Sequence, residues 1–288
     1  MQKSSLRFSI VIPALNEENY LPLLLTDLSQ QDHQAFEVIV VDGGSTDFTV
    51  KKTKTFKQKL NLTVLINQKK NVGQQRNKGA KHTRGEYLIF FDADVRVPTS
   101  FLTVLDKQIK RGGGYLFTTK LKVKSRSQAQ QVSIEMTNFV IELFNKVGKP
   151  FAPGFNIIIE QDLFVRLKGF DSTLKLAEDH DLVQRARKNG VLLKVLKKPI
   201  LYASMRRPEK IGYLKLLIQY TFSSLYALAG EPIKKELYDY PMGGHVYSNN
   251  EKNDLWADLE KLRPKVKSNL RSLKQKIAKV AKNIELPF

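Results

Sequence analysis

The sequence predicts an α/β fold with a mostly parallel central sheet flanked by helices, followed by a helical extension at the C-terminus. In the first 110 residues, short apolar runs alternate with amphipathic stretches, which is typical of parallel βαβ units. Several of these runs end in polar or flexible residues, as strands do at the ligand-binding edge of an open sheet. The last 30 residues carry a basic amphipathic pattern instead.

The elements follow in chain order. Apolar runs bounded by Pro, Gly, Asn or Asp predict strands at 8–12, 36–41, 62–66, 87–91, 115–123 and 155–159. The first run ends at Pro13, and a Gly112-Gly113-Gly114 break precedes the fifth. Spacings of three and four between apolar residues, together with helix-start signals, predict helices at 17–30, 47–59, 72–83, 98–111, 128–147, 178–188 and 211–229.

Domain boundaries follow from these elements. Residues 1–205 read as one domain, with halves at about 1–110 and about 111–205, and 206–288 form the extension. The 288 residues include no cysteine, which excludes disulfides and cysteine-ligated metal sites. With no signal-peptide pattern and no apolar stretch of about 20 residues, we expect a cytoplasmic protein, peripheral at the inner membrane face if the extension binds there.

The charge of +20 is spread along the chain. It indicates either an anionic partner or a lysine-rich proteome. Apolar residues at 259, 262, 266, 270, 273, 277, 280 and 284 form one helical stripe, and 261–284 holds nine Lys/Arg and no Asp/Glu. The stripe suits an anionic membrane surface, docking on the chain's own domain, or a homodimer seam. Arg206-Arg207 would add an interfacial contact, and the absence of a recognised binding fold disfavours nucleic acid.

The polar residues that follow the early strands are the candidate site. Glu17 follows the first strand, Asp42 the second, and Asp92-Ala93-Asp94 the fourth. Two carboxylates at the end of a buried strand are costly unless a cation binds them, and a hard divalent cation carrying a nucleotide diphosphate fits them. Taken singly, such residues also serve as helix caps or turns.

Several motifs occur together in order. The runs at 9–18 (SIVIPALNEE), 40–47 (VVDGGSTD), 73–80 (GQQRNKGA) and 85–94 (GEYLIFFDAD), with a later one spanning 169–185, closely resemble glycosyltransferase family 2. The resemblance covers about residues 7–200. It implies a GT-A fold, a nucleotide-sugar donor and a divalent metal, Mn²⁺ or Mg²⁺. It also implies that 1–205 is the catalytic domain, with about 1–110 as its nucleotide-sugar half and about 111–205 as its acceptor half.

The resemblance also implies residue roles. Nucleotide-sugar binding falls to Pro13, Leu15, Glu17, Asp42, Gly73, Arg76, Asp92 and Ala93. Asp94 and Asp92 would hold the metal, with His245 as an added ligand from a Gly-rich loop. Arg76 and His245, taken alone, also fit ordinary surface residues.

Glu178-Asp179 is the implied catalytic pair, with Asp179 as the base that deprotonates the acceptor hydroxyl. The competing interpretation is a helix start, where acidic residues favour the helix dipole. The predicted function is an inverting, metal-dependent transferase of hexosyl type, with UDP-sugar favoured and a lipid-linked or glycolipid hydroxyl as acceptor. The alternative is a non-catalytic sugar-nucleotide-binding or scaffold protein of the same fold. A nucleotidyltransferase, dehydrogenase or kinase would need glycine-rich signatures that are missing.

Overall fold

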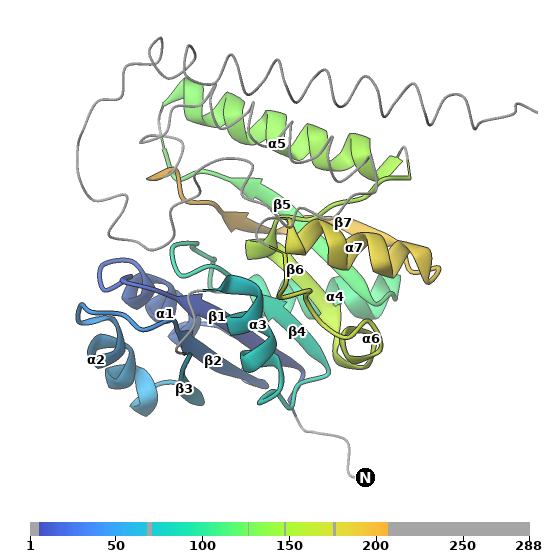
Figure 1. Ribbon diagram of the computed structural model, residues 1–288. Helices are drawn as coiled ribbons and strands as arrows, with labels where there is room; N and C mark the ends of the chain where they lie inside the picture. Colours follow the sequence, from blue (N-terminus) through green and yellow to red (C-terminus); the bar gives the residue numbers. More distant parts are fainter. Residues whose placement is uncertain (1–5, 68–70, 126, 147, 175–176, 207–288) are drawn as a thin grey trace, which may run out of the picture.

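The computed structural model describes residues 6–67, 71–125, 127–146, 148–174 and 177–206 (Figure 1). The predictions for the C-terminal stripe, the 211–229 helix and His245 lie outside the described residues.

A seven-stranded sheet forms the centre, in the order β3-β2-β1-β4-β6-β5-β7. The strands are β1 Phe8–Ala14, β2 Phe36–Asp42, β3 Leu62–Ile66, β4 Tyr87–Phe90, β5 Leu116–Lys122, β6 Ile157–Glu160 and β7 Leu193–Tyr202. The first four are mutually parallel, β6 runs antiparallel to β4 and β5, and β5 pairs parallel with β7. The α/β class and the mostly parallel sheet predicted from sequence are therefore confirmed.

Helices cover both faces of the sheet. They are α1 Leu21–Ser29, α2 Thr49–Lys54, α3 Val72–Ala80, α4 Phe101–Gly112, α5 Gln128–Lys146, α6 Gln161–Arg166 and α7 Glu178–Lys188. Short 3-10 turns occupy Thr55–Gln58 and Gly154–Asn156. Strands β1, β2 and β4 are buried at every position, which explains why they read as continuous apolar runs rather than alternating ones.

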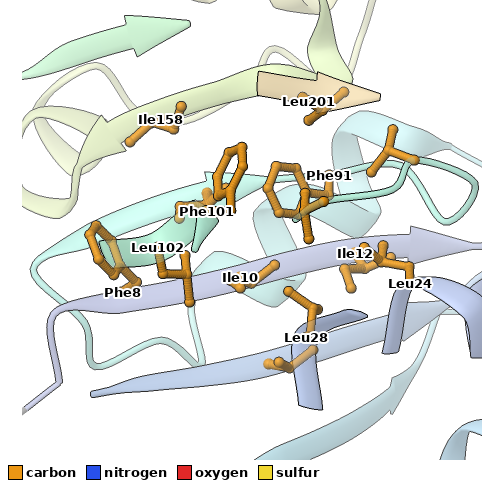
Figure 2. Packing of buried hydrophobic residues seen from close by; sticks show 14 of the residues in the cluster. Phe8, Ile10, Ile12, Leu24, Leu28, Phe91, Phe101, Leu102, Ile158 and Leu201 are labelled. Carbon is orange, nitrogen blue, oxygen red and sulfur yellow. The ribbon is translucent and has the colours of Figure 1, made fainter. Parts of the chain in front are cut away.

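Two apolar clusters hold these layers together. Alternate residues of β1 point to opposite faces, so Ile10 joins α1 and α4 in one cluster, whereas Val11 joins α6 and α7 in the other. Figure 2 shows the first cluster, with Leu24 and Leu28 of α1 and Phe101 of α4 around β1. At roughly 1.5–3 kcal/mol for each fully buried large side chain, these clusters supply the main driving force for folding.

The structure changes some predicted boundaries for local reasons. Helix α1 begins at Leu21 rather than at 17, because the backbone N–H groups of Glu17 and Glu18 bond to Thr49 and Asp47 instead of entering a helix. Strand β6 begins at Ile157 because 154–156 form a 3-10 turn. Strand β7 and helix α6 were not predicted. In β7, seven of the ten positions are exposed or half-exposed, and three of these are lysines, so the apolar pattern is weak.

Helix α5 lies in the chain between β5 and β6. Its Asn138 side chain donates to the carbonyl of Leu121 (2.8 Å) and accepts from that residue's N–H (2.9 Å), which fixes the middle of α5 to the end of β5. Of the described helices, none has the length and apolar content needed to span a bilayer.

Candidate active site

The turns after β1 and β2 interlock at the carboxyl edge of the sheet. The N–H of Asn16 donates to Ser45 Oγ (2.8 Å), and the N–H of Thr46 donates back to Asn16 Oδ1 (2.8 Å). Asn16 has a φ of 53°, a left-handed conformation that Asn tolerates better than most residues. These bonds hold two of the predicted binding segments against each other.

Asp42 is buried at 2% exposure and closes the turn after β2. Its Oδ2 accepts from the N–H groups of Gly44 and Ser45 (2.9 Å each), while its Oδ1 accepts from the Ser45 hydroxyl. Pro13 and Leu15, at the end of β1 and just beyond it, are buried too. A direct role of these three residues in nucleobase recognition stays a prediction.

Helix α3 ties the two halves of the sheet together. The Asn77 side chain donates to the carbonyl of Phe170 (2.7 Å) and accepts from its N–H (2.9 Å). Asn71 caps α3 by accepting from the N–H of Gln74 (2.8 Å), and it donates to the carbonyl of Ser172 (3.3 Å). Gly73 lies in the first turn, where the nearest atoms to an added Cβ include Glu178 Cγ at 3.7 Å.

Arg76 of α3 is a buried cation at the centre of the candidate site. It is 3% exposed and donates to Glu178 Oε1 (2.8 Å) and to Asp92 Oδ1 (2.9 Å). Its guanidinium lies over the ring of Phe170. A Cβ on Gly154 would stand 2.7 Å from Arg76 Nη1, so glycine is needed there. The surface alternative for Arg76 is wrong, because the side chain is enclosed by residues far apart in the chain.

Asp179 is held by three hydrogen-bond donors. Its Oδ2 accepts from the N–H of Gly154 (2.8 Å), and its Oδ1 accepts from the N–H of His180 (2.8 Å) and lies 3.1 Å from His180 Nδ1. The His180 ring stacks on Phe151, with centroids 4.7 Å apart. A neutral His180 therefore carries its proton on Nδ1, facing the carboxylate.

The two carboxyls of the predicted pair diverge in acidity. Burial and the neighbouring Asp179 charge raise the pKa of Glu178, against the opposing pull of Arg76. Burial alone would raise the pKa of Asp179 as well, but the His180 hydrogen bonds and nearby Arg76 outweigh it and hold that pKa below its usual value. Such opposed environments for adjacent carboxyls are typical of acid–base sites.

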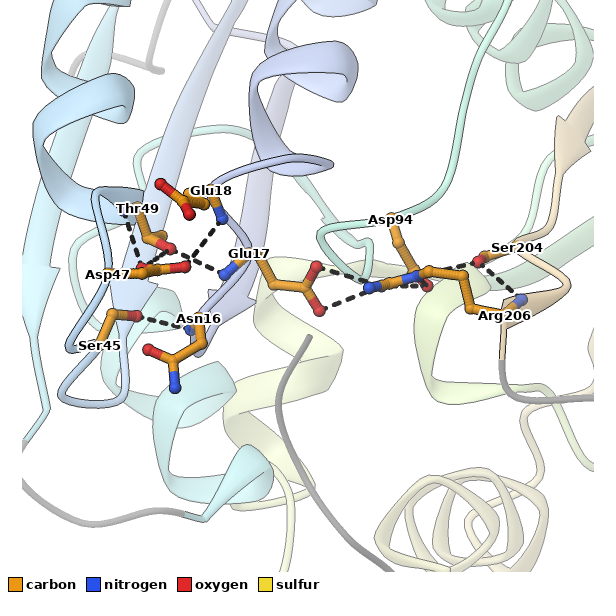
Figure 3. A network of polar contacts seen from close by, with 9 residues as sticks. All are labelled: Asn16, Glu17, Glu18, Ser45, Asp47, Thr49, Asp94, Ser204 and Arg206. Atoms are coloured by element: carbon orange, nitrogen blue, oxygen red, sulfur yellow. Dashed lines mark hydrogen bonds and ion pairs between the residues drawn. The ribbon is translucent and has the colours of Figure 1, made fainter. Parts of the chain in front are cut away.

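Arg206 closes the other side of the edge (Figure 3). Its Nη2 lies 2.6 Å from Asp94 Oδ2 and 3.1 Å from Glu17 Oε1, and its guanidinium lies 3.8 Å from the ring centroid of Tyr20. Burial raises the pKa of Glu17 to about 7, although Arg206 opposes the shift. The expectation that Arg206 makes an interfacial contact is wrong, because its guanidinium is engaged here. Sequence reasoning missed this role, since Arg206 follows the unpredicted β7.

The carboxylates fit a hard divalent cation, since oxygen donors are what Mg²⁺ and Mn²⁺ take. Asp92 and Asp94 flank the buried Ala93 at this edge, and each has a guanidinium partner, Arg76 and Arg206 respectively. The buried guanidinium of Arg76 and the half-buried one of Arg206 show that the carboxylates at this edge attract positive charge. Among the described residues, no three His, Cys, Asp or Glu side chains gather to form a metal cage. A cation here would draw its remaining ligands from substrate phosphates and water.

The family model described as glycosyl transferase family 2 matches residues 9–167. The chain belongs to this family. The match includes β1 to β6, Arg76 and the Asp92–Asp94 triplet, so the resemblance inferred from the motifs is confirmed.

Curated relatives agree with this membership. The chain is 29% identical over 217 residues to poly(ribitol-phosphate) beta-N-acetylglucosaminyltransferase TarS of Staphylococcus aureus, a match covering 72% of this chain and 37% of that protein. It is 28% identical over 212 residues to an uncharacterized glycosyltransferase of Haemophilus influenzae, covering 66% and 62%. The chain thus spans well under half the length of the staphylococcal relative.

Solved structures show the same GT-A fold. TarS residues 1–349 in complex with UDP-GlcNAc aligns with a TM-score of 0.60 at 24% identity, covering 84% of this chain and 69% of that one. The mannosyltransferase PcManGT of Pyrobaculum calidifontis, solved with GDP-Man and Mn²⁺, aligns with a TM-score of 0.61 at 17% identity, covering 98% and 76%.

Proposed function

We propose that this chain transfers one sugar from a nucleotide diphosphate donor to a hydroxyl acceptor, with inversion at the anomeric carbon. The observation that carries the proposal is the Glu178–Asp179 pair, in which a buried arginine and three hydrogen-bond donors place one ionised carboxylate beside one of raised pKa. Family membership supplies the donor class.

Asp179 would act as the base. Among the described residues, one donor bonds to its Oδ2, the N–H of Gly154, and a carboxylate oxygen has room for a second donor. The acceptor hydroxyl would give its proton to Asp179 while its oxygen forms a bond to the anomeric carbon. The bond from that carbon to the nucleotide diphosphate breaks on the opposite face, and the leaving group departs with the electron pair. Because the pKa of Asp179 is lowered, the residue stays ionised across the neutral range.

Donor binding would use the carboxyl edge of β1, β2 and β4. Pro13, Leu15 and Asp42 would line the base and ribose, and Arg76 would hold Asp92 in place. Asp94, with Asp92, would hold Mn²⁺ or Mg²⁺, which when bound stabilises negative charge on the leaving diphosphate. UDP is the favoured nucleotide, because the TarS structures were solved with UDP and UDP-GlcNAc.

The acceptor is proposed to be a hydroxyl of a lipid-linked glycan or glycolipid at the inner face of the membrane. The charge and the C-terminal stripe support this choice. The domain limits of 1–205 and 206–288 remain our proposal too, as does metal ligation by His245.

The test is donor hydrolysis and transfer across UDP-, GDP- and dTDP-sugars with Mn²⁺, Mg²⁺ or EDTA. Metal-dependent turnover of one donor is the expected result. Asp179→Asn should lower kcat by about 10²–10⁴-fold while donor affinity, measured by calorimetry, stays within a few-fold.

Asp162→Asn is the matched control, because Asp162 is an exposed acid in the first turn of α6. Turnover should be unchanged in that variant. Full turnover by Asp179→Asn would remove Asp179 from the base role. Donor binding without turnover across acceptors, unaltered by Asp179→Asn, would favour the scaffold alternative.

A further inference from the structure

The outer face of α5 exposes a continuous apolar stripe. Val132, Met136, Phe139 and Leu143 are 54%, 47%, 59% and 41% exposed. Their spacings of four, three and four residues place them on one side of the helix. The opposite side already supplies the core contacts, through Ile134 and Ile141. Isolated exposed apolar residues are ordinary, but four in a row on one helix mark a binding surface.

Positive charge gathers at the two ends of α5, whereas the helix itself carries Glu135, Glu142 and one lysine, Lys146. Between residues 120 and 149 the described chain holds five lysines and two glutamates, and one of these, Glu142, is paired with Lys120 at 3.0 Å. Exposed lysines lie just before α5, in its last turn and just after it: Lys122, Lys124, Lys146 and Lys149. The apolar face therefore has a cationic rim at both ends.

We infer that the outer face of α5 binds the surface of an anionic lipid bilayer. An apolar stripe with lysines at its margins is how interfacial helices combine burial among acyl chains with attraction to anionic headgroups. The positive charge at the ends of α5 argues against two other candidates for binding this face, the chain's own C-terminal segment and a second copy of the chain. The C-terminal segment 259–284 is itself strongly basic, and a second copy would bring the same lysines against this rim.

This surface is physically joined to the catalytic pair. Phe144, on α5, contacts the ring of Phe151 edge-on with centroids 5.7 Å apart, and Phe151 stacks on His180. His180 in turn faces Asp179. If the proposed function holds, docking through α5 brings the base toward acceptors carried by the membrane. The docking itself does not depend on that function.

The absence of native cysteine permits a direct test. A polarity-sensitive dye is attached to Phe139→Cys in the full chain, and its emission is read with vesicles of phosphatidylcholine alone or mixed with phosphatidylglycerol. The control is the same dye on Val165→Cys in α6, which is 67% exposed and lies away from α5 (Figure 1). We expect a blue shift at position 139 with anionic vesicles only, and none at position 165.

Each other outcome would overturn the inference. Co-sedimentation with vesicles but no shift at 139 would place the membrane contact elsewhere in the chain. If the dye emission at position 139 shifts without vesicles and the shift grows with protein concentration, a second copy of the chain binds this face. If that shift does not depend on concentration, the chain's own C-terminal extension binds there. No vesicle binding at all would also reject it.

A charge variant adds a quantitative check. Phe139→Glu should weaken partitioning into anionic vesicles by about tenfold or more, whereas Val165→Glu should leave it unchanged. Calorimetric binding of UDP to both variants shows that the fold and the donor site are intact. Failure of docking with UDP binding retained would reject the membrane surface alone. Lack of binding of UDP, GDP and dTDP alike by the unmodified protein would reject the proposed function alone.

Discussion

Replacing Arg76 by methionine tests the central ion-pair cluster. Methionine keeps most of the stem volume that packs near Phe170 but removes the charge that faces Glu178 and Asp92. The side chain of Arg76 is only 4% exposed and that of Glu178 13%, so the Glu178 carboxylate loses its cation where little water can replace it. Removing one partner of such a buried pair costs about 3–5 kcal/mol of folding free energy.

The ion pairs of Arg76 with Glu178 and with Asp92 do not contribute equally to the folding free energy. The Asp92 side chain is 40% exposed, so water screens its pair with Arg76 and that pair adds less than about 1 kcal/mol. The cost also depends on pH. Burial raises the pKa of Glu178, and losing Arg76 raises it further, so the folded variant takes up a proton more readily than the unfolded chain. The penalty should therefore be smaller near pH 5 than near pH 8.

Urea unfolding at these two pH values measures the effect. The double variant Arg76→Met/Glu178→Gln should recover most of the lost stability, because the buried Glu178 carboxylate is no longer left charged without its partner. Lys110→Gln is the control, since Lys110 is 68% exposed in its pair with Asp106 and its loss should cost under about 1 kcal/mol. A cost below about 1 kcal/mol for Arg76→Met, or no recovery in the double variant, would refute the reasoning.

Three further outcomes are expected. The pKa of Glu17 is raised to about 7 in the folded protein, so this carboxyl contributes folding stability at low pH that is lost as the pH rises through about 7. In urea titrations, Glu17→Gln should therefore flatten the dependence of unfolding free energy on pH between about pH 5 and pH 8. Gly85→Ala would place a Cβ 2.6 Å from the backbone of Phe8 and should cost about 1–3 kcal/mol in thermal unfolding, whereas Gly112→Ala, with no atom within 4 Å, should be close to neutral. EDTA should abolish donor turnover, and Mn²⁺ or Mg²⁺ should restore it; turnover unaffected by EDTA would reject the metal assignment.

Strands β1, β2 and β4 were predictable because they are buried on both faces and read as continuous apolar runs. Strand β3 was predicted with the bounds that the structure shows, and α7 likewise, since apolar runs and helix signals are strong there. The contact of Arg76 with Glu178 follows from no local pattern, because 102 residues separate the two in the chain. A resemblance to known motifs was what singled out both residues.

Arg206 shows why the remaining contacts of the candidate site could not be predicted from the sequence. Its neighbour in the sequence is another arginine and an aromatic segment follows, a pattern that indicates a surface contact. Only the path of β7 brings it to Asp94, and the seven exposed or half-exposed positions of β7, three of them lysines, break the apolar alternation that would have predicted the strand. The local sequence predicted α5 as a helix. Which of its apolar residues are exposed follows only from the structure, which shows the side of the helix that packs on the core.

The side chains of helix α3 determine which contacts must be kept when segments of this chain are exchanged with those of a relative. Arg76, Asn77 and Asn71 each reach across to the segment 170–178, and each does so through a side chain rather than through sheet pairing. To keep the hydrogen bonds that these three side chains make, a recombinant that takes residues 115–205 from a relative needs partners at Phe170, Ser172 and Glu178. Two of these partners are backbone carbonyls, which any amino acid supplies. Exchange of this whole segment would therefore have to keep the Glu178 side chain as the ion-pair partner of Arg76, together with the glycine at 154 that leaves room for the guanidinium.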